Sequence, residues 1–356
     1  MSSKENSETA PARAPSPAEL LVLAERAATP VFWPLRLQRR LARPGLAGSL
    51  VAAALLLLTW VAAGGWRADA LQPGLVGEAL FFALSLGLIL ELAALIPRAA
   101  QKDLDALAGE LTVDPPLLDR LRAALIRYPA RDVAVNALIG LAFGVLHVVL
   151  TGSGQAVLSG DPVAGVMALG TLALWAMMMQ TGPVLVANAR VFASLGRNAA
   201  RVEPLLLDRL RPFARAAMRP MFLVMVLLAA YPLMLLGAGA LTATTAIGPV
   251  ATACLALAAV WLPLRGLRQR IIKARGLQLA RLDAAIAAAL QAGDRFGAPA
   301  EPQRLEALIA LRSRLQATAS LPIGLGGLGR ALLYLALPVA TWGGKGFAEA
   351  LLNWLF

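Results

Sequence analysis

Residues 76–96 read VGEALFFALSLGLILELAALI, a run in which apolar side chains predominate. A helix rises about 1.5 Å per residue, so a run of this length matches the roughly 30 Å hydrocarbon core of a bilayer. Five further stretches have a similar length and composition. They are residues 48–66, 133–151, 162–183, 220–240 and 247–264. The sequence therefore predicts an all-α membrane protein with six transmembrane helices.

The composition of the 356-residue chain agrees with this prediction. Hydrophobic residues make up 58% of it and charged residues only 15%, whereas about a quarter of the residues in a soluble domain are charged. One cysteine and one histidine argue against a disulfide scaffold and a zinc module. We expect no metal and no cofactor.

Motifs of the common enzyme classes are absent from the sequence, which has no Walker loop, no GxSxG elbow and no HExxH helix. We therefore expect no enzymatic activity. The weaker alternative is a lipid-headgroup enzyme built around Asp132 or Asp208, and Asp208 would equally fit a helix N-cap.

The basic residues predict the orientation of the six helices. Of the 33 lysines and arginines, 31 lie before the first apolar stretch, in 97–132, in 184–219 or in 265–330. Cytoplasmic loops carry such an excess, so we expect a cytoplasmic N-terminus and three membrane hairpins, each followed by a cytoplasmic segment. Contact with anionic headgroups explains the net charge of +12. No recognition module indicates a nucleic-acid partner.

Four parts are expected along the chain. Residues 1–18 are polar and rich in Pro and Ser, which predicts a disordered cytoplasmic tail. Residues 19–264 hold the six-helix membrane domain and cytoplasmic interfacial helices. In residues 265–319, two runs with helical spacing flank GDRFGAPAEP (293–302), which predicts a cytoplasmic helical hairpin. Packing beneath the membrane bundle and a free coiled coil both fit this hairpin.

Residues 320–356 are apolar but interrupted by Pro338 and Gly343. A kinked seventh span, a re-entrant pair of half-helices and an interfacial amphipathic helix all fit them; we favour a broken seventh element. Its candidate polar stripe has members four residues apart, and these are Lys345, Glu349 and Asn353.

Polar side chains within the apolar stretches are candidate site residues, because an unpaired charge in a membrane is costly. Glu91, Asn136 and Gln180 are expected at a similar depth near the cytoplasmic side. They would form a polar vestibule or ion site, with Glu91 protonatable or cation-binding. The competing interpretation is a set of hydrogen bonds between helices, or an acid that reaches toward Arg98.

His147 is a further candidate, as a pH sensor or, more simply, as a hydrogen-bonded structural residue. Gly140 and Gly144 form a GxxxG motif in the same stretch, for which we favour packing within the chain over dimerisation. A row of arginines before 220–240 is expected to contact anionic lipid headgroups. The row consists of Arg211, Arg215 and Arg219.

Three segments carry a resemblance to a known family. They are VEPLLLDRLRPFARAAMR (202–219), WLPLRGLRQRIIKAR (261–275) and LPIGLGGLGRALLYLALPVATW (321–342). The chain resembles a family of uncharacterised bacterial polytopic inner-membrane proteins of unassigned function, mainly in its C-terminal half. It departs from the family pattern at Leu321 (usually Trp), Gly324 (usually Asp) and Glu203–Pro204 (usually Asp-Leu). The resemblance implies a multi-pass protein of the bacterial inner membrane and no particular reaction.

Two functions fit these observations. The first is a non-enzymatic membrane scaffold or signal-relay protein whose hairpin 265–319 binds a cytoplasmic protein or a second copy. The alternative is an ion channel or transporter that uses Glu91, Asn136 and Gln180, or the C-terminal stripe. Broken helices with polar stripes favour the alternative, but the nearly wholly apolar stretches 48–66, 220–240 and 247–264 favour the scaffold.

Overall fold

The structure is a computed structural model that describes residues 18–40, 47–67, 71–235, 243–296, 302–318 and 329. Its helices are α1 (Ala18–Glu25), α2 (Trp33–Arg40), α3 (Ala47–Trp60), α4 (Pro73–Leu107), α5 (Pro115–Ala124), α6 (Ala130–Leu150), α7 (Ser153–Leu158), α8 (Pro162–Asn198), α9 (Arg211–Ala230), α10 (Ala243–Phe296) and α11 (Pro302–Ala317). Short helical turns η1 to η5 cover Arg26–Ala28, Val61–Gly65, Ala108–Glu110, Leu207–Leu210 and Tyr231–Leu235. Within the described residues, all regular structure apart from two isolated bridges is helical, which confirms the all-α class for this part of the chain.

Four helical segments are long and apolar enough to cross a membrane. These are Pro73–Glu110, Ala130–Leu150, Pro162–Asn198 and Leu207–Met234, and they correspond to four of the six predicted stretches. The apolar helix at Leu50–Gly65 is shorter. Stretch 247–264 opens α10, where the side chains of 243–259 lie outside the described residues. Six spans therefore stay a prediction.

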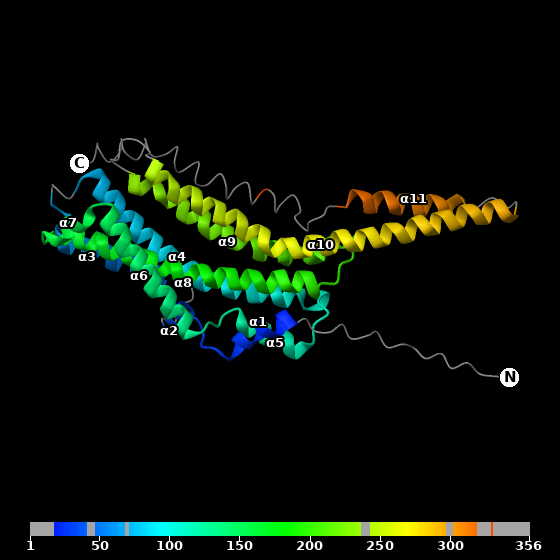
Figure 1. The fold of residues 1–356 in the computed structure, drawn as a ribbon, viewed down its shortest axis with the longest axis horizontal. Coiled ribbons are helices and arrows are strands. Elements are labelled where there is room, and N and C mark those ends of the chain that lie inside the picture. Colours follow the sequence, from blue (N-terminus) through cyan, green and yellow to red (C-terminus); the bar gives the residue numbers. More distant parts are fainter. Residues whose placement is uncertain are drawn as a thin grey trace.

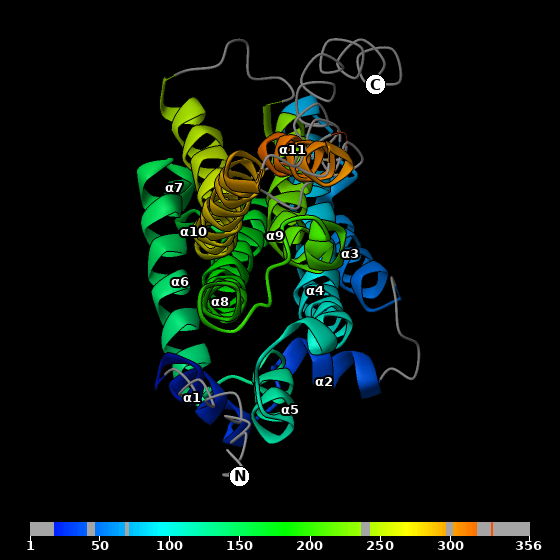
Figure 2. The ribbon, with the colours of Figure 1, turned by 90° about the vertical axis from the view of Figure 1, so that its right-hand side faces the viewer.

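The long helices α4, α8, α9 and the first part of α10 run alongside one another (Figure 1), and α8 and α9 contact each other and both α4 and α10. Seen along this bundle, α6 and α3 lie on opposite sides of it and pack on α8 and α4, while α1, α2 and α5 lie together below it (Figure 2). We call the end at α7 the loop end and the opposite end, from which α10 projects, the arm end.

Two of the long helices continue beyond the expected ends of their apolar stretches. We expected ends at 96 and 183, but α4 runs to Leu107 and α8 to Asn198. Their extensions form a core at the arm end with α1, α5 and α9. Its fully buried members include Leu20, Leu104, Leu121, Leu195 and Phe213. Burial of these apolar side chains stabilises the packing of the two extensions against α1, α5 and α9.

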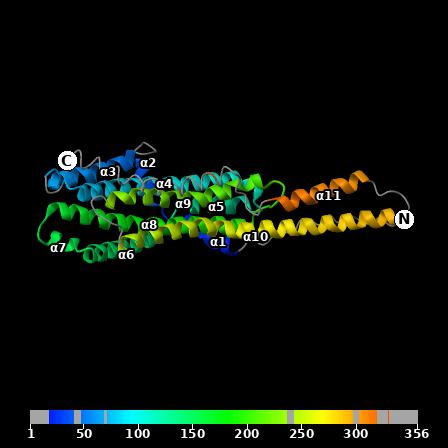
Figure 3. The same ribbon diagram turned by 90° about the horizontal axis from the view of Figure 1, so that it is seen from above.

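Helix α10 is a single helix of 54 residues. Leu267 and Ile271 are still fully buried in the core at the arm end, but the following residues leave the bundle with α11 beside them (Figures 1 and 3). Arg312 Nε lies 2.6 Å from Asp283 Oδ1 and Arg275 Nη1 donates to the carbonyl oxygen of Thr318 at 3.0 Å, so the two helices are antiparallel. We call residues 272–296 together with α11 the arm.

The arm contains the two helical runs expected in 265–319. The first run belongs to the same helix as stretch 247–264, so no helix end lies at the expected boundary of 265, and the division into domains stays a prediction. The expected tail 1–18 lies outside the described residues except for Ala18, which begins α1, and the broken seventh element 320–356 lies outside them except for Gly329.

Candidate functional site

Helix α2 supplies partners for two of the candidate polar residues. Trp33 Nε1 donates to Gln180 Oε1 at 2.7 Å, and Gln38 Nε2 donates to Glu91 Oε2 at 3.0 Å. Gln38 Oε1 in turn accepts from Arg98 Nη1 at 2.8 Å. Both Gln38 and Glu91 are buried. Gln38 thus lies between an acidic and a basic side chain of α4 and connects them.

The expected grouping of Glu91, Asn136 and Gln180 is met only in part. Glu91 and Gln180 both meet α2, and Gln180 also lines a cavity of about 310 Å³ between α2 and α6. Asn136 on α6 is half-buried, and within the described residues no hydrogen bond joins its side chain to the other two. Sequence reasoning missed the role of α2, because its segment WPLRLQRR (33–40) is basic and short.

Tyr128 joins three segments at the arm end of α6. Its hydroxyl donates to the carbonyl oxygen of Val184 at 2.8 Å and accepts from Arg26 Nη1 at 3.3 Å. The Arg26 guanidinium also lies 5.4 Å from the centre of the tyrosine ring. Burial raises the pKa of the Tyr128 hydroxyl well above its usual range, although the charge of Arg26 opposes this.

Two of the three arginines in the basic row have a buried acidic partner. Asp103 on α4 is 3% exposed in its side chain, and its carboxylate contacts Arg215 Nε at 3.3 Å and Arg219 Nη1. Arg211 instead pairs with Asp208 at 2.8 Å, with both side chains largely in solvent. The ion pairs join α4 to α9. Contact of this row with anionic lipid stays a prediction.

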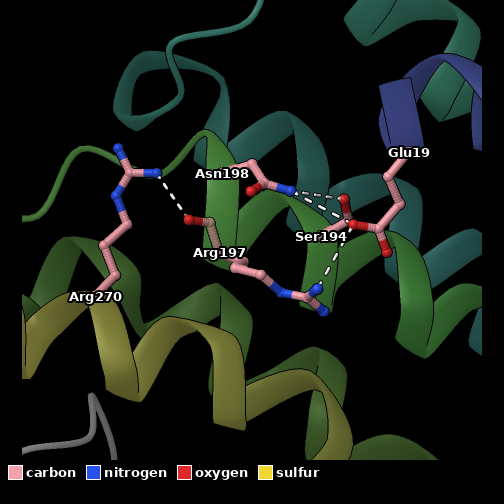
Figure 4. A network of polar contacts seen from close by, with 5 residues as sticks. All are labelled: Glu19, Ser194, Arg197, Asn198 and Arg270. Atoms are coloured by element: carbon pink, nitrogen blue, oxygen red, sulfur yellow. Dashed lines mark hydrogen bonds and ion pairs between the residues drawn. The ribbon is translucent and has the colours of Figure 1, made fainter. Parts of the chain in front are cut away.

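A second polar network lies at the base of the arm (Figure 4). Glu19 Oε2 on α1 lies 3.7 Å from Arg197 Nη1 and accepts from Asn198 Nδ2 at 3.5 Å. Asn198 Nδ2 also lies 3.3 Å from Ser194 Oγ, and Arg270 Nη1 on α10 donates to the carbonyl oxygen of Arg197 at 3.0 Å. The last turn of a helix has free carbonyl groups, so Arg270 satisfies one at the end of α8. The network connects α1, α8 and α10.

Two glycines permit close contact of α8 and α10 beside this network. A Cβ atom on Gly266 would lie 2.8 Å from the carbonyl oxygen of Ala193, and one on Gly196 would lie 3.1 Å from Leu267 Cβ. The distance at Gly266 leaves no room for a Cβ atom, and the distance at Gly196 is tighter than most Cβ contacts. The base of the arm is therefore packed tightly on α8. The sequence did not predict this contact, because the two glycines lie far apart in the chain and form no local motif.

The GxxxG motif of α6 packs within the chain, which confirms that prediction. A Cβ on Gly140 would lie 2.6 Å from Ala176 Cα, and one on Gly144 would lie 2.9 Å from Leu172 Cδ2. Both neighbours belong to α8. Small residues here let the two apolar helices approach closely.

A cavity of about 690 Å³ opens at the loop end. Its wall includes Arg67, Glu78, His147 and Asp161. Glu78 and His147 are half-buried, on α4 and α6. His147 packs on Trp175 with ring centres 6.2 Å apart, but the hydrogen bond expected for its imidazole is not found within the described residues. Sequence reasoning missed Glu78, although it is one of two acids in the stretch 76–96.

His147 lies far along α6 from the end where Glu91 and Gln180 meet α2, so the four candidates do not form one site. The candidate stripe Lys345, Glu349 and Asn353 lies outside the described residues. No group of three or more metal-binding side chains occurs in the part of the chain that the structure describes.

Comparison with known proteins finds no matching family model, no matching curated protein and no matching solved structure. The resemblance to a bacterial inner-membrane family therefore stays a prediction.

Proposed function

We propose that the protein is a non-enzymatic scaffold or signal-relay protein of the bacterial inner membrane, whose arm associates with a cytoplasmic protein or a second copy of the chain. The observation that carries this proposal is the course of α10, which connects the apolar bundle to the projecting arm without interruption. A change at either end would be transmitted through one helix.

The apolar surface of the bundle supports insertion in a membrane. Only 11% of the residues in the most apolar stretch of α6 are buried. Leu138 and Val149 on this helix are 65% and 63% exposed. Apolar surface of this extent is unfavourable in water. Arginines are concentrated at the arm end, which supports a cytoplasmic arm by the positive-inside rule.

The arm has an exposed helical face suited to another helix. Four exposed residues of α10 follow one another at spacings of three, four and three residues: Leu277, Ala280, Ala284 and Ala287. The next position of this register is the exposed Gln291, where the apolar face ends. This heptad spacing is typical of the contact positions of coiled coils, and alanine permits a close approach. Docking of a partner helix would remove this face from water.

The proposal is tested by placing a photo-crosslinking residue at Ala288 and irradiating intact cells. We expect adducts, identified by mass spectrometry as a partner or a second copy, that are lost in A280E/A287E. The matched control A285E introduces the same residue on the same helix outside the heptad positions and should keep them. Absence of adducts, or adducts that survive A280E/A287E, would contradict the proposal.

The second candidate is an ion channel or transporter. The cavity at the loop end supports it, because it reaches Glu78 within the apolar helix α4. The hydrogen bonds of Glu91 and Gln180 to α2 make it the weaker proposal, since these groups already have polar partners. Ion flux into liposomes that falls in E78Q or E91A, with the amount of folded protein unchanged, would favour this function over the scaffold.

A further inference from the structure

The cavity at the loop end has a mixed polar and apolar wall. Residues of η2, α4, α6, α7, α8 and η5 line it. Leu75, Val148 and Met167 supply apolar surface, and Thr151 and Ser153 supply hydroxyl groups. A volume of about 690 Å³ falls within the range of small-molecule sites in proteins, which is roughly 300–1,000 Å³.

Three charged side chains line this cavity, but only one already has a structural role. Asp161 Oδ1 accepts from the backbone N–H of Val163 at 3.0 Å and so caps the start of α8. Arg67 folds over Gly64, whose Cβ would lie 3.0 Å from Arg67 Nε. Among the ion pairs of the described residues, none joins Arg67 to Glu78 and none includes either residue.

Opposite charges that share a cavity without neutralising each other match a ligand that carries both charges. A half-buried carboxylate such as that of Glu78 has lost part of its hydration, and an ammonium group would replace the lost water. Guanidinium groups bind the oxyanions of carboxylates and phosphates through paired hydrogen bonds. The apolar wall would cover the carbon atoms between the two charged groups.

We propose that this cavity binds a small zwitterion, with its ammonium group on Glu78 and its oxyanion on Arg67. Two sources have this chemistry: a free solute of amino-acid type, and the phosphoethanolamine headgroup of a lipid. The cavity lies at the end of apolar helices, where headgroups would be found if these helices span a bilayer. The inference concerns the end of the molecule opposite the arm, and its test is independent of arm docking.

The test uses the purified full-length chain in detergent. Binding of phosphoethanolamine is measured by calorimetry, with ethanolamine and inorganic phosphate as probes that carry only one of the two charged groups. Retention of phosphatidylethanolamine against phosphatidylglycerol is measured by native mass spectrometry. We expect the zwitterionic probe or lipid to bind best. Binding of soluble phosphoethanolamine identifies a free solute as the source, and retention of the lipid alone identifies the headgroup.

Two variants test the assigned roles separately. E78Q and R67Q should each weaken binding by about tenfold or more, since each removes a charge-assisted contact. E306Q changes an exposed acid on α11 and should bind like the parent. R67K keeps the positive charge and should retain part of the affinity. If E78Q does not fold, the comparison of R67K with R67Q decides the test. Equal binding of ethanolamine or phosphate alone, no binding by folded parent, or unchanged binding in both variants would overturn the proposal.

Discussion

Gly266 on α10 lies directly against the carbonyl oxygen of Ala193 on α8, at a distance that leaves no room for a methyl group. The contact occurs where α10 leaves the bundle, next to the fully buried Leu267. Small residues at a helix interface let the backbones approach closely, and glycine adds no side chain at all. This pair of residues fixes the position from which the arm projects.

The first prediction concerns this contact. G266A should lower the stability of the protein by about 1–3 kcal/mol, the usual cost of overpacking a close contact. The measurement is thermal unfolding of the purified protein in detergent. G276A is the matched control on the same helix, since a Cβ there would meet nothing within 4 Å, and its higher helix propensity should leave stability unchanged or slightly raised. Equal Tm values for the two variants would show that the contact is not tight.

The second prediction concerns Gln38, which connects Glu91 to Arg98. Q38L leaves the buried Glu91 and the half-buried Arg98 each without one of their partners, so we expect stability to fall by about 1–3 kcal/mol. Q38L/E91L removes the acid as well and should lose less than the sum of the two single changes. Thermal unfolding of the four proteins provides the double-mutant cycle. Additive losses would mean that the hydrogen bond between Gln38 and Glu91 contributes little.

The third prediction compares two aspartates. D103N removes the charge of a buried carboxylate that contacts Arg215 and Arg219, and we expect a loss of about 1–3 kcal/mol, below the range for fully buried pairs because both arginines are partly exposed. D208N removes the acid of an exposed ion pair and should cost about 0–1 kcal/mol. Similar unfolding temperatures for the two variants would contradict the assigned importance of Asp103.

The sequence predicted those parts of the fold that depend on local composition. Apolar length placed α4, α6, α8 and α9, and the spacing of Gly140 and Gly144 predicted a close helix contact. The sequence did not predict that α4 and α8 extend beyond the apolar runs. Arg98 and Arg190 follow these runs, and we interpreted them as the start of cytoplasmic loops. Their helices continue because one face of each is buried in the core at the arm end.

The candidate site was predictable only as single residues. Glu91 and Gln180 stood out as polar groups in apolar stretches, but their partners Gln38 and Trp33 come from a helix far away in sequence. No local pattern in one sequence indicates such pairs. Glu78 was within reach of the same reasoning, because it lies in the same apolar stretch as Glu91. What identifies it as a site residue is the cavity, which is lined by residues of five other elements of the fold.

The fourth prediction concerns the buried hydroxyl of Tyr128. Below about pH 10, Y128F should be less stable than the parent by about 1 kcal/mol, because it loses the hydrogen bond to the carbonyl oxygen of Val184. The pKa of Tyr128 is raised in the folded protein, while an unfolded tyrosine has a pKa of about 10. The unfolded parent therefore releases a proton that the folded parent keeps, and this part of its stability is lost as pH rises above about 10.

Y128F has no such proton, so the difference in Tm between parent and variant should be largest at neutral pH and should shrink at about pH 11, one unit above the unfolded pKa. Thermal unfolding of both proteins at the two pH values measures this directly. The comparison cancels the titration of every other group, because the lysines and the remaining tyrosines are common to both chains. A difference that stays constant with pH would show that the Tyr128 hydroxyl titrates alike in the folded and unfolded states, and hence that water reaches it between Arg26 and Val184.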